Sequence, residues 1–179
     1  MKILVIESSP HKHGSSNLLA GAFIRGAQEA GHTIAVFDAG HADLHPCLGC
    51  GACGMSGPCV QKDDMAPLRE QLLTCDAAVF VTPLYYFGFS TQLKTVIDRF
   101  YSFNGQLAAM KLKTVLIAAA WDSNDWTMRD IKAHYETLCN YLNFQNQGEI
   151  LATGCGTVQM TKHTRFVQDA YWLGKRIGG

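Results

Sequence analysis

The chain has 179 residues, enough to form a full hydrophobic core without disulfide staples, and we expect a single domain over residues 1–179. Its 15 Lys and Arg side chains balance 15 Asp and Glu side chains, so no net charge favours nucleic acid or an anionic membrane surface as a partner. No apolar run reaches the ~20 residues that span a bilayer. The lack of a signal-peptide pattern and the odd count of seven cysteines predict a cytoplasmic protein.

Five short apolar runs predict the strands of one sheet. In chain order they cover residues 3–6, 33–37, 77–81, 115–119 and 149–152. The first, third and fourth are unbroken, as is typical of parallel strands covered on both faces. The second and fifth are weaker and suit positions nearer the edges of the sheet.

Apolar residues at helical spacing predict amphipathic helices between these strands. The stripes are Leu19, Phe23, Ala27 and Ala30; Leu68, Leu72 and Leu73; Leu93, Val96, Ile97 and Phe100; Ile131, Tyr135, Leu138 and Leu142; and, over residues 164–176, Phe166, Ala170 and Leu173. We expect Gly31 to end the first helix and Asp63 and Asp64 to cap the second.

Strands that alternate with helices predict a three-layer α/β fold with helices on both faces of a five-stranded parallel sheet. Short right-handed crossovers favour the strand order 2-1-3-4-5, which is the flavodoxin-like topology. Ligands in that topology bind beyond the carboxyl ends of the strands. The loops that follow the strands are therefore the candidate site.

The loop after the first strand is rich in groups that bind anions. Ser9, His11, Lys12 and His13 precede Gly14-Ser15-Ser16-Asn17, where a helix begins with free N–H groups. No Gly-Lys-Ser/Thr motif and no dinucleotide glycine fingerprint is present, so a single phosphate such as that of FMN fits better than a nucleoside triphosphate. The alternative is an ordinary capped helix after a polar turn.

The loop after the third strand contains four aromatic side chains in five positions, from Tyr85 to Phe89. Aromatic side chains at a sheet edge can stack on a planar ring, while the backbone contacts the polar edge of that ring. A hydrophobic plug or an oligomer interface is the alternative interpretation. Trp121, after the fourth strand, is as consistent with packing as with ligand contact.

Four cysteines form a compact motif, Cys47-x2-Cys50-x2-Cys53-x5-Cys59. Thiolates at this spacing can converge on a [4Fe-4S] cluster or on zinc, and the intervening glycines permit the tight wrapping that either would need. The alternative is four reduced thiols in a glycine-rich loop. Cys75, Cys139 and Cys155 lie in or beside regular elements, and we expect them to be small core residues.

Three motifs in this order resemble the NAD(P)H-dependent FMN reductase and iron–sulfur flavoprotein family. They are Ser-Ser-Pro-x-x-x-Gly-Ser-Ser-Asn from Ser8, the cysteine motif continued to Asp63-Asp64-Met65, and Thr-Pro-Leu-Tyr-Tyr from Thr82 with Gln-Leu-Lys-x-x-x-Asp-Arg from Gln92. The resemblance covers about the first hundred residues. It implies a flavodoxin-like fold, FMN as cofactor, NAD(P)H as co-substrate and a homodimer or homotetramer.

The resemblance also implies roles for individual residues. Ser9, His11, His13, Ser15, Ser16 and Asn17 would hold the FMN phosphate; Pro83, Leu84, Tyr85, Tyr86, Phe87 and Gly88 would flank the isoalloxazine; and Cys47, Cys50, Cys53 and Cys59 would ligate a cluster. Family members often have Arg or Lys where this chain has His11, so its phosphate affinity would depend on pH. No protein acid or base is obligatory for flavin reduction, and none is named.

Three functions remain open at this point. The first is an FMN-dependent NAD(P)H oxidoreductase that reduces a small acceptor such as a quinone, a nitroaromatic compound or free flavin. The second is an iron–sulfur flavoprotein electron carrier that exchanges single electrons with a ferredoxin. The third is a non-enzymatic flavodoxin-like module with structural zinc. The visible spectrum separates them, because flavin, flavin with a cluster, and neither chromophore absorb differently.

Overall fold

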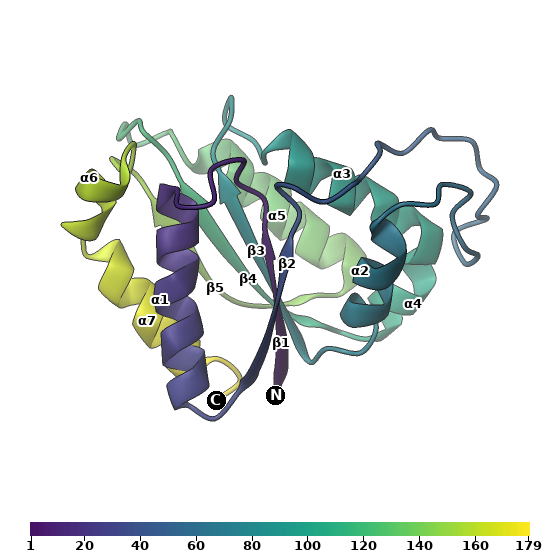
Figure 1. Ribbon diagram of the computed structural model, residues 1–179, viewed down its shortest axis with the longest axis horizontal. Coiled ribbons are helices and arrows are strands. Elements are labelled where there is room, and N and C mark those ends of the chain that lie inside the picture. Colours follow the sequence, from purple (N-terminus) through teal and green to yellow (C-terminus); the bar gives the residue numbers. More distant parts are fainter.

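The computed structural model describes all residues from 1 to 179 and contains one sheet with helices on both faces (Figure 1). The strands are β1 (Lys2–Glu7), β2 (Thr33–Asp38), β3 (Ala77–Pro83), β4 (Lys113–Ala119) and β5 (Gln145–Ala152). All neighbouring pairs are parallel, and the spatial order is β2-β1-β3-β4-β5. The predicted fold class and strand order are confirmed. The two weaker strands, β2 and β5, are the edges.

The helices divide between the two faces of the sheet (Figure 1). On one face lie α1 (Ser15–Glu29), α6 (Val158–Lys162) and α7 (Phe166–Arg176); on the other lie α2 (Met65–Leu72), α3 (Thr91–Arg99), the 3-10 turn η1 (Phe100–Phe103), α4 (Asn104–Ala109) and α5 (Arg129–Leu142). The predicted helices are present. The short elements η1, α4 and α6 were not predicted, because four to six residues are too few to display a helical stripe.

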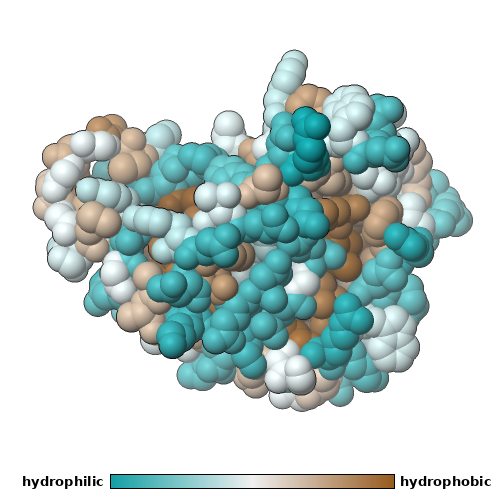
Figure 2. All heavy atoms as spheres, turned by 180° about the vertical axis from the view of Figure 1, so that it is seen from behind, coloured by the Kyte–Doolittle hydropathy of each residue, from teal (hydrophilic) through white to brown (hydrophobic).

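Side chains on β1 alternate between two cores, as the period of a strand requires. Ile3 and Val5 belong to a core of 19 buried residues under α1 and α7, whereas Leu4 and Ile6 belong to one of 26 buried residues under α2 to α5. Apolar surface buried on both faces is the main stabilising contribution to such a sheet. Figure 2 shows the side opposite to Figure 1, where hydrophilic side chains dominate and apolar atoms are visible in patches between them.

The ends of the first two helices differ in how closely they follow the sequence-based expectation. Gly31 has φ 83°, a left-handed conformation that follows the end of α1 and favours glycine. Asp64 precedes α2 but makes no side-chain cap, whereas the Asp63 carboxylate accepts a hydrogen bond from the Met65 N–H at 3.2 Å. The capping role expected of the Asp63-Asp64 pair therefore falls to Asp63 alone.

Glycines bring α1 and α7 into close contact. A methyl group at Gly26 would overlap the Tyr171 carbonyl oxygen, and one at Gly174 would overlap the Phe23 carbonyl oxygen. The two helices can therefore approach until their backbones touch, which holds the C-terminal half of α1 against α7. No helix combines the length and the apolar character needed to cross a bilayer.

Candidate functional site

An open pocket of about 740 Å³ lies at the carboxyl edge of the sheet, where the loops after four strands meet (the upper edge in Figure 1). Its lining comprises Ser9, Pro10, His11, Lys12, His13, Gly14, Ser15 and Ser16 after β1; Pro83, Leu84 and Tyr85 after β3; Ala119 and Trp121 at the end of β4; and Cys155, Gly156, Thr157 and Val158 after β5. This volume lies within the range of ~300–1,000 Å³ typical of cofactor pockets.

The end of this pocket beside α1 contains groups that can bind an anion. Helix α1 has no side-chain N-cap and no acidic residue in its first turn, so its first N–H groups and its positive dipole end face the loop. Lys12, His11 and His13 line the same end, and no Asp or Glu lines the pocket. A phosphate would find hydrogen-bond donors and positive charge there without a competing carboxylate.

The turn that carries these residues is held by its own hydrogen bonds. The His11 N–H donates to the Ser9 hydroxyl at 3.1 Å, and the Gly14 N–H donates to the His11 carbonyl at 2.9 Å. A Cβ at Gly14 would lie 3.0 Å from that carbonyl oxygen and 3.1 Å from Ser9 Oγ, and one at Gly40 would overlap the Ser9 carbonyl. The two glycines, which have no Cβ to meet these carbonyl groups, therefore allow the turn to be tight.

The aromatic loop after β3 is a tight hairpin that rises from the sheet edge as a narrow projection (Figure 1). The Tyr85 and Gly88 backbones exchange hydrogen bonds of 3.2 and 3.1 Å. Tyr86 and Phe87 between them adopt φ of 44° and 65°, which non-glycine residues avoid unless the surrounding structure imposes it. The hairpin turns Tyr86 out to 99% exposure, and Phe87 packs against Trp126 with ring centroids 5.3 Å apart.

The structure thus separates the residues expected to bind FMN into two groups. Lining the pocket are Ser9, His11, His13, Ser15, Ser16, Pro83, Leu84 and Tyr85. Outside the lining are Asn17, Tyr86, Phe87 and Gly88. Asn17 instead donates from its side-chain amide to the Lys12 carbonyl at 3.2 Å and braces the turn. Tyr86 and Phe87 form the tip of the hairpin, and Gly88 pairs with Tyr85 at its base, so these three residues lie outside the lining.

The wall formed after β5 was not predicted as part of the site. The Trp121 ring lies over Gly156, where a methyl group would overlap the indole. Cys155 is 2% exposed and belongs to the core as expected, yet it also lines the pocket. A signal was present in the sequence: Gly154, Gly156 and Thr157 follow the last strand as a glycine-rich turn with a helix N-cap, and parallel strands place such turns at one edge.

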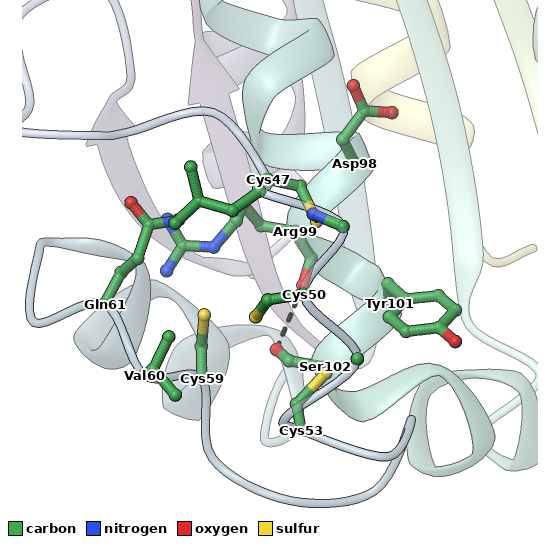
Figure 3. Close-up of a pocket in the computed structure, with 13 residues that line it drawn as sticks. Cys47, Cys50, Cys53, Cys59, Val60, Gln61, Asp98, Arg99, Tyr101 and Ser102 are labelled. Carbon is green, nitrogen blue, oxygen red and sulfur yellow. Dashed lines mark hydrogen bonds between the residues drawn. The ribbon is translucent and has the colours of Figure 1, made fainter.

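The cysteine motif forms a separate loop between β2 and α2, and its four cysteines line one hollow against α3 and η1 (Figure 3). Gly49, Gly51 and Gly54 have φ of 62°, 70° and 55°, so glycine supplies the wrapping backbone. No group of three or more His, Cys, Asp or Glu side chains is placed to hold a metal ion. The donor set suits a thiolate-bound cluster in kind, and ligation would require the loop to draw its sulfur atoms together.

A buried ion pair lies beneath this cysteine loop. Arg99, the last residue of α3, donates to both Asp63 carboxylate oxygens at 2.6 and 3.0 Å and to the His45 carbonyl at 2.8 Å. Both side chains of the pair are 1% exposed. Burial opposes ionisation of Asp63, but hydrogen bonds from Arg99 and from the His45 and Met65 N–H groups outweigh it and lower the pKa of Asp63 to about 2.

The same ion pair raises the pKa of the Arg99 guanidinium. Burial alone would lower it, but the hydrogen bonds and charge of Asp63, with a contribution from the Cys59 thiol, raise it. Arg99 Nε has no hydrogen-bond partner although it is buried.

The cysteine hollow and the carboxyl-edge pocket share no lining residue, and the cysteine loop extends from the right of the molecule in Figure 1.

Comparisons with known proteins agree with this geometry. A family model described as NADPH-dependent FMN reductase matches residues 1–154. An iron–sulfur flavoprotein of Archaeoglobus fulgidus is 33% identical over 99 residues, which are 55% of this chain and 45% of that protein. The chain therefore spans about half the length of the iron–sulfur flavoproteins that it matches.

Two further similarities extend over most of the chain. A Bacillus subtilis protein whose name describes an NAD(P)H-dependent FMN-containing oxidoreductase, YwqN, is 26% identical over 174 residues, 86% of each chain. An NAD(P)H:quinone oxidoreductase from Methanothermobacter marburgensis superposes with a TM-score of 0.80 at 18% identity, covering 100% of this chain and 96% of that one. At that identity the superposition establishes the fold alone.

Proposed function

The chain belongs to the NADPH-dependent FMN reductase family, and we propose that it is an FMN-dependent NAD(P)H oxidoreductase that reduces a small acceptor. The observation that carries this proposal is the carboxyl-edge pocket, in which an uncapped helix N-terminus and a cationic turn face a wall of apolar and aromatic side chains. One end suits a phosphate and the other a flat ring. Family membership argues against the non-enzymatic alternative.

We assign the phosphate to the turn after β1. Ser9 and Ser16 are buried and line the pocket, and the N–H groups at the start of α1 lie beside them. His11, Lys12, His13 and Ser15 also line this end, and Asn17 supports the turn from outside. Hydrogen bonds from these groups to a charged phosphate are stronger than those to a neutral acceptor.

We assign the ring of the cofactor to the part of the pocket that is lined by Pro83, Leu84 and Tyr85 and by Trp121. When bound, FMN supplies the hydride chemistry, whereas the protein binds and orients it. Trp121 is 72% exposed, so this end of the pocket remains accessible to other molecules. Such access suits a nicotinamide and then a flat acceptor, for which we propose quinones, nitroaromatic compounds or free flavin.

The test is to purify the chain with excess FMN and then measure oxidation of NADPH and NADH without oxygen, using each acceptor class in turn. We expect a yellow protein that quenches flavin fluorescence and turns over with at least one of these classes. A colourless protein that leaves flavin fluorescence unchanged would contradict FMN binding. Retention of FMN without any nicotinamide oxidation would instead contradict the catalytic part of the proposal.

Assembly and location are part of the same proposal. Tyr86 at the hairpin tip is 99% exposed and Trp172 on α7 is 51% exposed, and aromatic surface of this kind is commonly covered by a subunit contact. We expect a homodimer or a homotetramer, and a sedimentation mass of one 19.6 kDa chain would contradict this. All seven cysteines are free, which suits the reducing cytoplasm.

A second candidate function is supported by the cysteine hollow. Cys47, Cys50, Cys53 and Cys59 line one cavity, and relatives that match about half of the chain carry the name iron–sulfur flavoprotein. The chain would then hold a [4Fe-4S] cluster as well as FMN, and a ferredoxin would be its electron partner. Anaerobic purification followed by iron and sulfide analysis tests this candidate, and zinc or unligated thiols are the outcomes that would replace it.

A further inference from the structure

The cysteine loop has no regular structure of its own, but contacts across its base close it. Residues 43 and 64 exchange two hydrogen bonds: the Asp64 N–H donates to the Asp43 carbonyl at 2.9 Å, and the Asp43 N–H donates to the Asp64 carboxylate at 2.8 Å. The Gln61 side chain donates to the Pro46 carbonyl at 2.9 Å. The two ends of the loop therefore lie side by side, and the cysteines are confined between them.

The Arg99 side chain, which lies outside the loop, forms hydrogen bonds with both ends of it. Arg99 donates to the His45 carbonyl, which lies before the first cysteine, and to the Asp63 carboxylate, which lies after the last. Asp63 in turn accepts from the His45 N–H at 3.1 Å. Because Arg99 belongs to α3, this contact also fixes the loop to the core of the protein.

Asp63 does not use all of the hydrogen-bonding capacity of Arg99. Arg99 Nε is buried without a partner, and Arg99 lines the same hollow as the four cysteines. Figure 3 shows the guanidinium between the segment around Cys47 and the Cys59 side chain. A buried donor without a partner is costly unless a further acceptor is bound nearby.

The chemistry of a cluster supplies such an acceptor. A [4Fe-4S] core of charge 2+ that is bound by four thiolates has a net charge of 2−. Its sulfur atoms accept hydrogen bonds from nearby donors, and these bonds together with local charge set its reduction potential. A guanidinium fixed in the wall of the hollow would offset part of that negative charge.

We propose that Arg99 is the positioning residue of the cysteine loop: it closes the loop through Asp63 and His45 and places its positive charge against the thiolates of a bound iron–sulfur cluster. This inference rests on the second candidate function described above. It goes beyond that function by assigning the stability and the potential of the cluster to a residue outside the motif.

The experiment compares wild-type protein with Arg99→Gln, Arg99→Lys and Asp63→Asn after anaerobic reconstitution with iron and sulfide. Iron and sulfide per chain, FMN per chain and the midpoint potential of the cluster are measured for each. Arg129→Gln is the matched control, because it removes the same charge from an exposed site on α5. We expect Arg99→Gln to weaken metal retention about 10- to 100-fold, as the loss of an outer-shell partner typically does, and the control to behave as wild type.

The potential separates an electrostatic role from a purely structural one. Arg99→Lys keeps the charge but not the forked geometry, so it should lose iron in part while its remaining cluster titrates near the wild-type potential. The cluster that Arg99→Gln retains should have a more negative potential, because a reduced cluster gains negative charge. Asp63→Asn should lose iron because the cysteine loop is no longer held closed, and it should keep FMN.

Two outcomes would overturn the inference. These are full iron with a wild-type potential in Arg99→Gln, or a wild-type protein that holds only zinc or no metal after reconstitution. FMN content and NAD(P)H oxidation are read on the same samples, so failure of the FMN proposal is recognised separately. If Arg99→Gln loses FMN as well and has therefore misfolded, the iron content and potential of Arg99→Lys decide the question.

Discussion

The indole ring of Trp121 lies over Gly156 so closely that a single methyl group on the glycine would overlap it. Trp121 follows β4 and Gly156 follows β5, so this contact joins two loops into one wall of the carboxyl-edge pocket. The remaining walls come from the turn after β1 and the hairpin after β3. The pocket therefore depends on a contact between residues that are 35 positions apart in the chain.

Replacing Gly156 with Ala should displace Trp121 and weaken FMN binding. Trp121 would have to return against the new methyl group to line the bound FMN, and overpacking of this kind costs about 1–3 kcal/mol. We therefore expect the dissociation constant of FMN to rise roughly tenfold or more. Titration of flavin fluorescence measures the change. Gly105→Ala is the control, because no atom lies within 4 Å of a methyl group there. Equal affinities for the two variants would show that the contact between Trp121 and Gly156 does not shape the cofactor site.

The double change Ser9→Ala with Ser16→Ala should weaken FMN binding through the phosphate. Each hydrogen bond to a charged group contributes about 1.5–3 kcal/mol, and both hydroxyls lie in the proposed phosphate end of the pocket. Riboflavin, which lacks the phosphate, should be bound equally by the variant and the wild type. Ser56→Ala, in the exposed part of the cysteine loop, provides the control. An unchanged FMN affinity would show that the phosphate does not bind to these two hydroxyls.

The Asp63–Arg99 pair should make stability depend on pH in the acid range. The pKa of Asp63 is lowered from 3.8 to about 2 in the folded state, so its contribution is fully present above about pH 4 and is lost as pH falls through about 2. The shift corresponds to about 2 kcal/mol. Urea unfolding of wild type and Asp63→Asn between pH 7 and pH 2 should show a difference in unfolding free energy that shrinks with acidification. A constant difference would contradict the assignment to Asp63.

Close packing of α1 on α7 predicts opposite effects for two glycines on the same helix. Gly26→Ala should lower the unfolding free energy by about 1–3 kcal/mol or more, because the new methyl group would overlap the backbone of α7. Gly21→Ala should raise it by about 0.5–1 kcal/mol, because no atom lies near that position and alanine favours the helix. Thermal or urea unfolding monitored by circular dichroism measures both. The same sign for the two variants would contradict the packing argument.

The amino-acid sequence was sufficient to predict the sheet and to place the loop that we assign to the phosphate at its carboxyl edge. Unbroken runs such as 77–81 have one stable environment, which is a strand covered on both faces, and their alternation with amphipathic helices leaves few possible topologies. Parallel strands bring their carboxyl ends to one edge, so the loops Ser9–Asn17 and Pro83–Gly88 were predicted to meet there. The parts of these loops from Ser9 to Ser16 and from Pro83 to Tyr85 line the same pocket.

The side chains that line the pocket and the contacts that hold the cysteine loop could not be predicted from the sequence, because they depend on how distant elements pack together. The direction of Tyr86 and Phe87 depends on two left-handed backbone conformations, which no local propensity of tyrosine or phenylalanine predicts. Arg99 lies on an amphipathic helix, where an arginine is ordinarily solvated, yet it is buried against a carboxylate 36 residues earlier in the chain. Periodicity reports which face of an element is apolar, whereas a pairing between distant residues is set by how the elements pack.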